Sequence, residues 1–392
     1  MFKFDSAPGY FIHLMSCMFH STKPKEKPEN VSFEEVYKLS NKQLFTNVTF
    51  CGIQQVENKP DDKLYEKWQS NYAYNLARCA NQMFELDIMI DAFISQGYDV
   101  MPLKGSVIKK YYPNPDMRPM SDIDLLVKSN DRDAVRKIMY ACGYEMFIPD
   151  DGQVDTFKKG NMIYVDLHYS LMAENHHGQE HFQDTWDIAV ETNKKGVYAF
   201  TFEDLYVYNI GHYAKHMFSS GTGMRCIADV YVLWNAASDY QKQIISEKLK
   251  SKELYTFNEK LVKISGIWFD GDEDDGTLCD VQEYFMNTST YGNEDSIDAI
   301  KLVTSNGEEI SKAQYYKKRL FPDADYLYSR YNVKHRSKVL LPFLWIRRMF
   351  GVLFKLNNVT NEVSKTQNVS KEDLEKSKSL YSKLGLLDND KN

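Results

Sequence analysis

The sequence predicts an α+β fold: a small mixed sheet with flanking helices, preceded by N-terminal helices and followed by a helical C-terminal domain. Helical periodicity fills residues 63–95, short strand-like runs separated by turn residues fill 98–170, and helical periodicity returns after about residue 200. At 392 residues the chain exceeds what one hydrophobic core usually organises, so we expect more than one domain.

We divide the chain into four segments. Residues 1–60 form a partly helical N-terminal extension, 61–200 the core with the sheet, 201–363 a helical domain, and 364–392 a polar tail. An acidic stretch at 269–311, which begins with DGDEDDG and continues with NEDS and NGEE, predicts a surface insertion in the helical domain.

The elements of the core follow from periodicity and turn residues. Apolar residues recur at helical spacing over 63–95, and Gly97 follows as a stop. In chain order we then expect a strand at 98–103, a short helix at 107–112, a strand at 122–127, a helix at 131–142 with Asn130 as its N-cap, and strands at 144–148, 154–159 and 162–168. Further helices are predicted at 202–218, 225–237 and 240–264.

Composition excludes some classes of protein. A net charge of −7 argues against a broad basic face that grips long nucleic acid, although a local pocket for a small anion remains open. Six scattered cysteines without metal-binding spacing indicate reduced thiols. No run of eighteen apolar residues exists, so we expect a cytoplasmic protein without a transmembrane segment. The oligomeric state cannot be predicted from these features.

Two aspartates stand in an apolar strand. In SDIDLLV, strand alternation places Asp122 and Asp124 on one face, about 7 Å apart along the chain. Two unpaired carboxylates on a buried strand cost several kcal/mol unless something neutralises them. A divalent cation is one solution; pairing with Lys or Arg at a strand end is the other.

A third aspartate repeats this pattern in MIYVDLH. Asp166 brings the count to three strand carboxylates, the usual provision for two metal ions in nucleotidyl transfer. Magnesium or manganese is the expected metal, because both prefer hard oxygen ligands. His168 lies two residues further on the same strand face, where it can reach a substrate or a metal, or form an ordinary half-buried hydrogen bond.

Candidate phosphate-binding residues precede the paired aspartates. Lys104-Gly105-Ser106 follows a strand and opens a short helix, so backbone amides and the Ser106 hydroxyl can donate to a phosphate. Arg118, four residues before Asp122, can hold a triphosphate with two hydrogen bonds or form an ion pair with an aspartate.

Three further residues on the predicted helices are candidates for substrate contact. His212 and His216 are spaced as zinc ligands are, but no Glu stands between them as in HExxH. Contact with a substrate or an acidic partner is therefore a stronger prediction than metal binding. Arg225 and Asp229 have the spacing of a helix ion pair, and Arg225 is also a candidate for contact with the substrate.

LKG, YYPNPDMRPMSDIDLLV and YVDLHYSL together resemble the bacterial "uncharacterised nucleotidyltransferase" family, whose fold is that of the DNA polymerase beta superfamily. The resemblance continues through NIGHYAKH and MRCIADVYVLW to the segment LFPDADYLYSRYNV, and extends over residues 60–355. It implies a polymerase-beta-like core in which Asp122, Asp124 and Asp166 are catalytic metal ligands and Gly105 and Ser106 contact the nucleotide. Fifteen residues separate Ser106 from Asp122, more than in the superfamily's compact pattern.

The predicted function is therefore a metal-dependent nucleotidyltransferase, with two Mg²⁺ or Mn²⁺ ions. It would move a nucleotidyl group from a nucleoside triphosphate such as ATP to an unidentified hydroxyl-bearing acceptor and release pyrophosphate. Two other interpretations stay open: a catalytically silent module that binds nucleotide as a regulator, and a toxin-like nucleotidyltransferase that modifies tRNA or protein.

Overall fold

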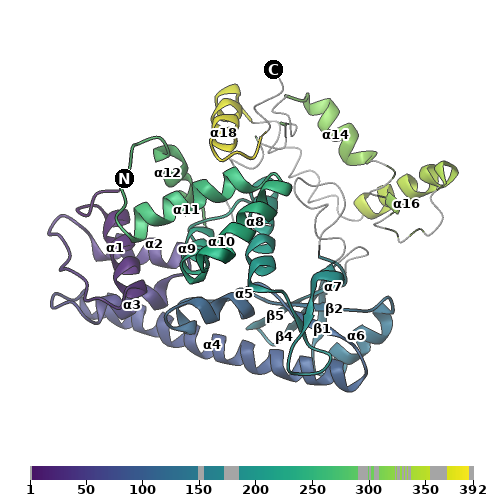
Figure 1. Cartoon of the computed structure of the whole chain (residues 1–392), viewed down its shortest axis with the longest axis horizontal. Coiled ribbons are helices and arrows are strands. Elements are labelled where there is room, and N and C mark those ends of the chain that lie inside the picture. Colours follow the sequence, from purple (N-terminus) through teal and green to yellow (C-terminus); the bar gives the residue numbers. More distant parts are fainter. Residues whose placement is uncertain are drawn as a thin grey trace.

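The fold is given by a computed structural model of the chain (Figure 1). The described residues are 2–148, 154–171 and 185–289, followed by 299, 302–303, 309–322, 324, 327–328, 331, 333, 337–353 and 369–387. No helix within these ranges has the length and apolar character needed to cross a membrane.

A five-stranded mixed sheet forms the centre of the core, with the strand order β1-β2-β5-β4-β3. Its strands are β1 (Val100–Pro102), β2 (Ile123–Val127), β3 (Glu145–Ile148), β4 (Val154–Lys159) and β5 (Ile163–His168). β2 and β5 are parallel neighbours, and the other pairs are antiparallel. All five predicted strands are present. β2 starts one residue later than predicted, so Asp122 immediately precedes the strand.

One face of the sheet packs on two helices, α4 (Asp62–Ser95) and α6 (Arg132–Ala141). In Figure 1 the long α4 runs beneath both the sheet and the N-terminal helices. The alternate residues Ile123, Leu125 and Val127 of β2 are buried in this layer. The N-cap of α6 is Asp131, whose side chain accepts from the amide of Ala134, and not the predicted Asn130. Because of the same alternation, Asp124 and Leu126 face the other side.

Leu126, on the second face, belongs to a large hydrophobic cluster formed by helices that precede and follow the sheet in the sequence. These helices are α1 (Ala7–Phe19), α2 (Phe33–Lys42), α3 (Thr46–Ile53), α8 (Phe202–Ser219), α9 (Arg225–Ala236), α10 (Asp239–Ser251) and α11 (Tyr255–Phe269). One continuous hydrophobic cluster joins residues of the N-terminal helices, α8–α11 and Leu126 of β2. The N-terminal extension and the helical domain therefore share a core, while the division at residue 200 stays a prediction.

The helix predicted at 240–264 is interrupted. The structure has two helices there, α10 and α11, with a break at Lys252, Glu253 and Leu254. Glu253 adopts a φ of +56°, outside the right-handed helical region, and the amide of Leu254 bonds back to the carbonyl of Leu249. Apolar periodicity continues across the break, because both helices bury apolar faces against the same core.

Two segments predicted as polar are partly structured. Within the acidic stretch 269–311, Cys279–Asn287 forms α12, whose Val281 and Phe285 are buried; most of 290–308 lies outside the described residues. In the polar tail, α18 (Lys371–Lys383) buries Tyr381, whose hydroxyl donates to the carbonyl of Met217. The tail helix agrees with the apolar patch at 380–387 in the otherwise polar tail, whereas the acidic composition of 269–311 gave no sign of α12.

Shorter elements complete the described chain. They are α5 (Gly105–Ile108), η1 (Lys109–Tyr111), η2 (Pro115–Met117), α7 (Thr185–Ile188), β6 (Val190–Glu191), β7 (Tyr198–Ala199), α14 (Lys312–Leu320), η4 (Lys338–Leu340) and α16 (Leu341–Leu353). The short helix predicted at 107–112 corresponds to α5 and η1, which connect β1 to the loop before β2.

Candidate active site

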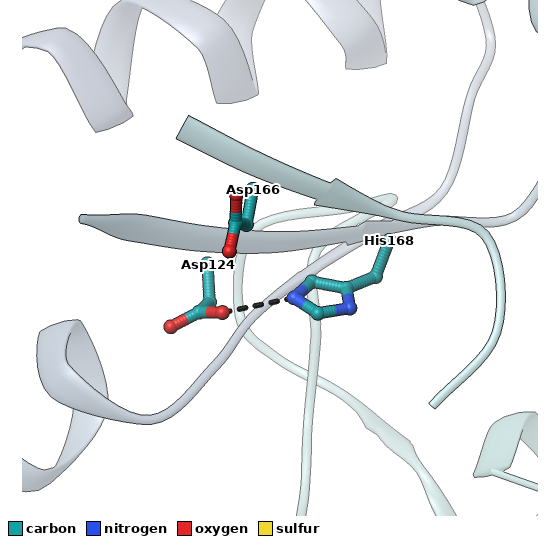
Figure 2. A group of neighbouring side chains, drawn as sticks. All are labelled: Asp124, Asp166 and His168. Atoms are coloured by element: carbon teal, nitrogen blue, oxygen red, sulfur yellow. Dashed lines mark hydrogen bonds and ion pairs between the residues drawn. The ribbon is translucent and has the colours of Figure 1, made fainter. Parts of the chain in front are cut away.

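Two aspartates meet across the parallel pair of strands. Asp124 of β2 is the register partner of Asp166 of β5, and Leu126 is the partner of His168. Register partners on neighbouring strands point to the same face, so Asp124, Asp166 and His168 all face away from α4. Each offers a ligand atom, and these atoms lie within 4.8 Å of one another. Figure 2 shows the three side chains on the two adjacent strands.

Asp124 is the most tightly bound of the carboxylates. Its side chain is 5% exposed, and Oδ1 accepts from Lys104 Nζ at 2.5 Å and lies 2.8 Å from His168 Nε2. Burial alone would raise the pKa of Asp124, but the charge of Lys104 and the His168 hydrogen bond outweigh burial and hold the pKa well below its usual range. Asp124 is therefore ionised in the folded protein at neutral pH.

Asp122 has the opposite electrostatic setting. Burial and the charge of Asp124 raise the pKa of Asp122 to about 6, although Lys104 acts against them. Asp166 adds to the same repulsion, which shows that the three carboxylates interact. One oxygen of Asp166 also accepts from the hydroxyl of Thr156 on β4, at 2.7 Å.

In the loop before α5, the backbone of Gly105 lies close to the side chain of Arg118. Lys104 has a φ of +45°, and a Cβ on Gly105 would lie 2.7 Å from Arg118 Nη1. Glycine therefore fits position 105 best, because a Cβ there would press on the buried Arg118 guanidinium and on Met120. The hydroxyl of Ser106 donates to the carbonyl of Leu103 at 2.9 Å, which is a bond within the turn.

Arg118 forms an ion pair with a distant aspartate. Its Nε and Nη2 donate to the two oxygens of Asp229 at 2.8 and 2.7 Å, and both side chains are buried. Tyr112 and Tyr213 also donate to Asp229. The predicted pair between Arg225 and Asp229 is therefore wrong. Asp229 points into the core toward Arg118, whereas Arg225 donates to Ser121 Oγ at 3.4 Å.

A cavity of about 420 Å³ lies between the carboxylates and α8. Ten of the eleven residues predicted as site residues line it: Lys104, Gly105, Arg118, Asp122, Asp124, Asp166, His168, His212, His216 and Arg225. Ser106 is not among its lining residues. The sheet supplies the acidic wall of this cavity, and α8 and the start of α9 supply the opposite wall.

The chain matches a known protein family. A family model described as "Uncharacterised nucleotidyltransferase" matches residues 29–270, more than half of the chain. The chain belongs to this nucleotidyltransferase family. No curated protein and no solved structure has significant similarity to it.

The match confirms that this nucleotidyltransferase has the predicted α+β core and is an enzyme of that class. The match starts before α2 and ends just after α11, so the C-terminal segment that the sequence resemblance included lies beyond it. The acidic cavity lies inside the matched region.

The donor set of the nucleotidyltransferase fits a divalent metal. Asp124, Asp166 and His168 bring two carboxylates and an imidazole within 4.8 Å, and Asp122 adds a carboxylate at the cavity wall. Burial and, after it, repulsion by Asp124 and Asp166 raise the pKa of Asp122, so the ionised carboxylate is unfavourable here in the metal-free protein. A cation bound there would remove this repulsion.

The two helix histidines of the nucleotidyltransferase bond to each other. His212 Nε2 and His216 Nε2 are 2.8 Å apart, and His216 Nδ1 lies 2.9 Å from Ser220 Oγ. Burial holds the pKa of His212 well below its ordinary value and lowers that of His216 to about 4, so both rings are neutral at pH 7. Neither belongs to the metal-ligand group found among the described residues.

Sequence reasoning missed Asn209 and Lys215, which line the cavity from α8 beside the histidines. A signal for Asn209 exists: it is a polar residue inside the apolar helical run LYVYNIG. Lys215 gives no such signal, because a lysine on a helix is usually solvated.

Proposed function

We propose that this nucleotidyltransferase is metal-dependent and uses the acidic cavity to move a nucleotidyl group from a nucleoside triphosphate to a hydroxyl acceptor. The observation that carries the proposal is the convergence of Asp124, Asp166 and His168 within 4.8 Å, in a family of nucleotidyltransferases. Carboxylates that converge in this way can hold the metal ions of two-metal phosphoryl chemistry.

A divalent metal bound by Asp122, Asp124 and Asp166 would neutralise the triphosphate and lower the pKa of the acceptor hydroxyl. The protein's own groups perform the remaining tasks. Lys104 and His168 hold Asp124 ionised and oriented. The hydroxyl of Thr156 donates to one oxygen of Asp166 and orients this carboxylate, which accepts the proton of the acceptor hydroxyl. The acceptor oxygen then bonds to the α-phosphorus, the bond to the β-phosphate oxygen breaks, and pyrophosphate leaves.

The acceptor in this proposal is a small molecule, a sugar-linked intermediate or a protein. The net charge of −7 favours these acceptors over long nucleic acid. The end of a tRNA could still bind through a local patch on the surface. None of the six cysteines, all of which lie within the described residues, forms a disulfide, and this supports the predicted cytoplasmic location.

The test incubates the full chain with each nucleoside triphosphate, Mg²⁺ or Mn²⁺, and host lysate. Label on the α-phosphate should appear on an acceptor, label on the γ-phosphate should appear only in released pyrophosphate, and Asp166→Asn should abolish both. Transfer of the γ-label would instead indicate phosphoryl transfer. Nucleotide binding without any pyrophosphate release would support the silent regulatory module.

A further inference from the structure

The α8 wall of the cavity contains a buried donor without an acceptor. Asn209 is only 3% exposed, and its Nδ2 has no hydrogen-bond partner among the described residues. Buried amide groups are nearly always hydrogen-bonded, because an unpaired one loses its bonds to water without compensation. Since Asn209 lines the cavity, a bound ligand is the natural source of the missing acceptor.

Lys215 is a second unsatisfied donor on the same wall. It lines the cavity and is half-buried, and no hydrogen bond or ion pair joins it to another residue in the described part of the chain. Burial and the nearby charge of Lys104 lower the pKa of Lys215. A buried ammonium beside a like charge is unfavourable unless an anion neutralises it.

The side-chain donors of Lys104, Ser106 and Arg118, which the sequence suggested for phosphate, already form hydrogen bonds within the protein. Lys104 is bonded to Asp124, Arg118 holds both oxygens of Asp229, and Ser106 donates to Leu103. Their hydrogen bonds within the protein leave the α8 wall as the better source of donors for a ligand.

We propose, resting on the proposed function, that α8 carries the phosphate subsite, in which Lys215 Nζ and Asn209 Nδ2 donate to the β- and γ-phosphates of the nucleoside triphosphate. Phosphate oxygens are acceptors, which is what two unsatisfied donors require. The sheet wall, with its carboxylates, faces the reacting α-phosphate, and the α8 wall faces the leaving pyrophosphate. The positive charge of Lys215 then stabilises the negative charge that develops on pyrophosphate as the bond breaks.

The experiment measures binding of inorganic pyrophosphate, the four nucleoside triphosphates and the four nucleoside monophosphates to the full chain by calorimetry with Mg²⁺. Lys215→Gln should weaken pyrophosphate and triphosphate binding by about tenfold or more, the effect of losing one charge-assisted hydrogen bond. Binding of monophosphates should change less than about twofold, since they lack the groups that Lys215 contacts. Lys215→Arg should restore most of the affinity, because it keeps the charge.

Asn209→Asp is a second, nearly isosteric variant. It replaces the donor with an anion and should also weaken pyrophosphate binding, which separates a ligand contact from a packing role. The control is Lys137→Gln, an exposed lysine of α6, which packs on the other face of the sheet from the cavity; this variant should bind like the parent.

The outcomes separate the two proposals. If Lys215→Gln binds pyrophosphate as well as the parent, the phosphate subsite is refuted while nucleotidyl transfer stands. If the variant loses as much affinity for monophosphates as for pyrophosphate and triphosphates, Lys215 does not contact the β- and γ-phosphates specifically. The assignment is then also refuted. If the parent binds no triphosphate and no pyrophosphate, the proposed function and this inference fall together.

Discussion

Asp124 and Asp166 are register partners on the two parallel strands at the centre of the sheet, so both carboxylates point into the same cavity. This relationship depends on the pairing of β2 with β5, which brings together residues 42 positions apart in the sequence. A slip of one residue would send one carboxylate to the opposite face, into the apolar layer against α4. The register of one strand pair therefore determines whether a metal site can exist.

The first prediction concerns activity. Asp166→Asn should lower nucleotidyl transfer by at least about 100-fold, because loss of a direct ligand should cost no less than loss of an outer partner of a metal site. Transfer of α-labelled nucleotide is the measurement. Asp133→Asn, an exposed aspartate on α6 with a side chain 86% exposed, is the matched control and should retain activity. Parent-like transfer by Asp166→Asn would remove Asp166 from the active site.

The two aspartates of the DID motif should respond oppositely to substitution in metal-free protein. The pKa of Asp122 is raised to about 6, so the stability linked to its protonated form is present at pH below about 4 and is lost as pH rises through 6. Asp122→Asn should therefore raise the free energy of unfolding at pH 7 by about 3 kcal/mol, and by almost nothing at pH 4.

Asp124 has a lowered pKa, so its contribution is present above the unfolded-state pKa and is lost as pH falls. Asp124→Asn leaves Lys104 without its anion and should destabilise the protein at pH 7. Denaturant unfolding of both variants in EDTA at pH 4 and pH 7 gives the comparison. Equal effects of the two substitutions at pH 7 would contradict the opposite electrostatic settings.

The buried pair of Arg118 and Asp229 should make a large contribution to the free energy of unfolding. Asp229→Asn leaves a buried guanidinium without its carboxylate, so we expect a loss of about 3–5 kcal/mol in the free energy of unfolding. Asp91→Asn removes the aspartate of an exposed pair with Lys194 and should cost less than about 1 kcal/mol. If Asp229→Asn loses as little stability as this control, the buried pair of Arg118 and Asp229 contributes no more to folding than an exposed pair.

Metal binding should be visible as stabilisation. Adding Mg²⁺ at 100 times its dissociation constant should raise the free energy of unfolding by about 2.7 kcal/mol, and EDTA should reverse the effect. The shift should be largely absent in Asp166→Asn and present in Asp133→Asn. Thermal unfolding of the three proteins at matched ionic strength measures it. An identical Mg²⁺ shift in Asp166→Asn would place the metal elsewhere.

Much of the core was predictable because its signals are local. Alternation over Ile123–Val127 predicted a strand with one acidic face, and the structure has that strand and that face. The same reasoning failed at 240–264, where apolar spacing stays helical across a break that depends on the backbone of Glu253. Local patterns report which face of an element is buried and are less sensitive to where the element ends.

The sequence by itself determined the chemistry: Asp124 and Asp166 on strands, Asp122 just before one, a glycine at position 105, and the family to which the chain belongs. Only the tertiary structure decided how the charges are used. Arg118 is paired with Asp229, 111 residues away, and Asn209 and Lys215 of α8 are left without partners among the described residues. The physical reason is range: periodicity reflects interactions between residues a few positions apart, whereas charge pairing depends on which surfaces the packed core brings into contact.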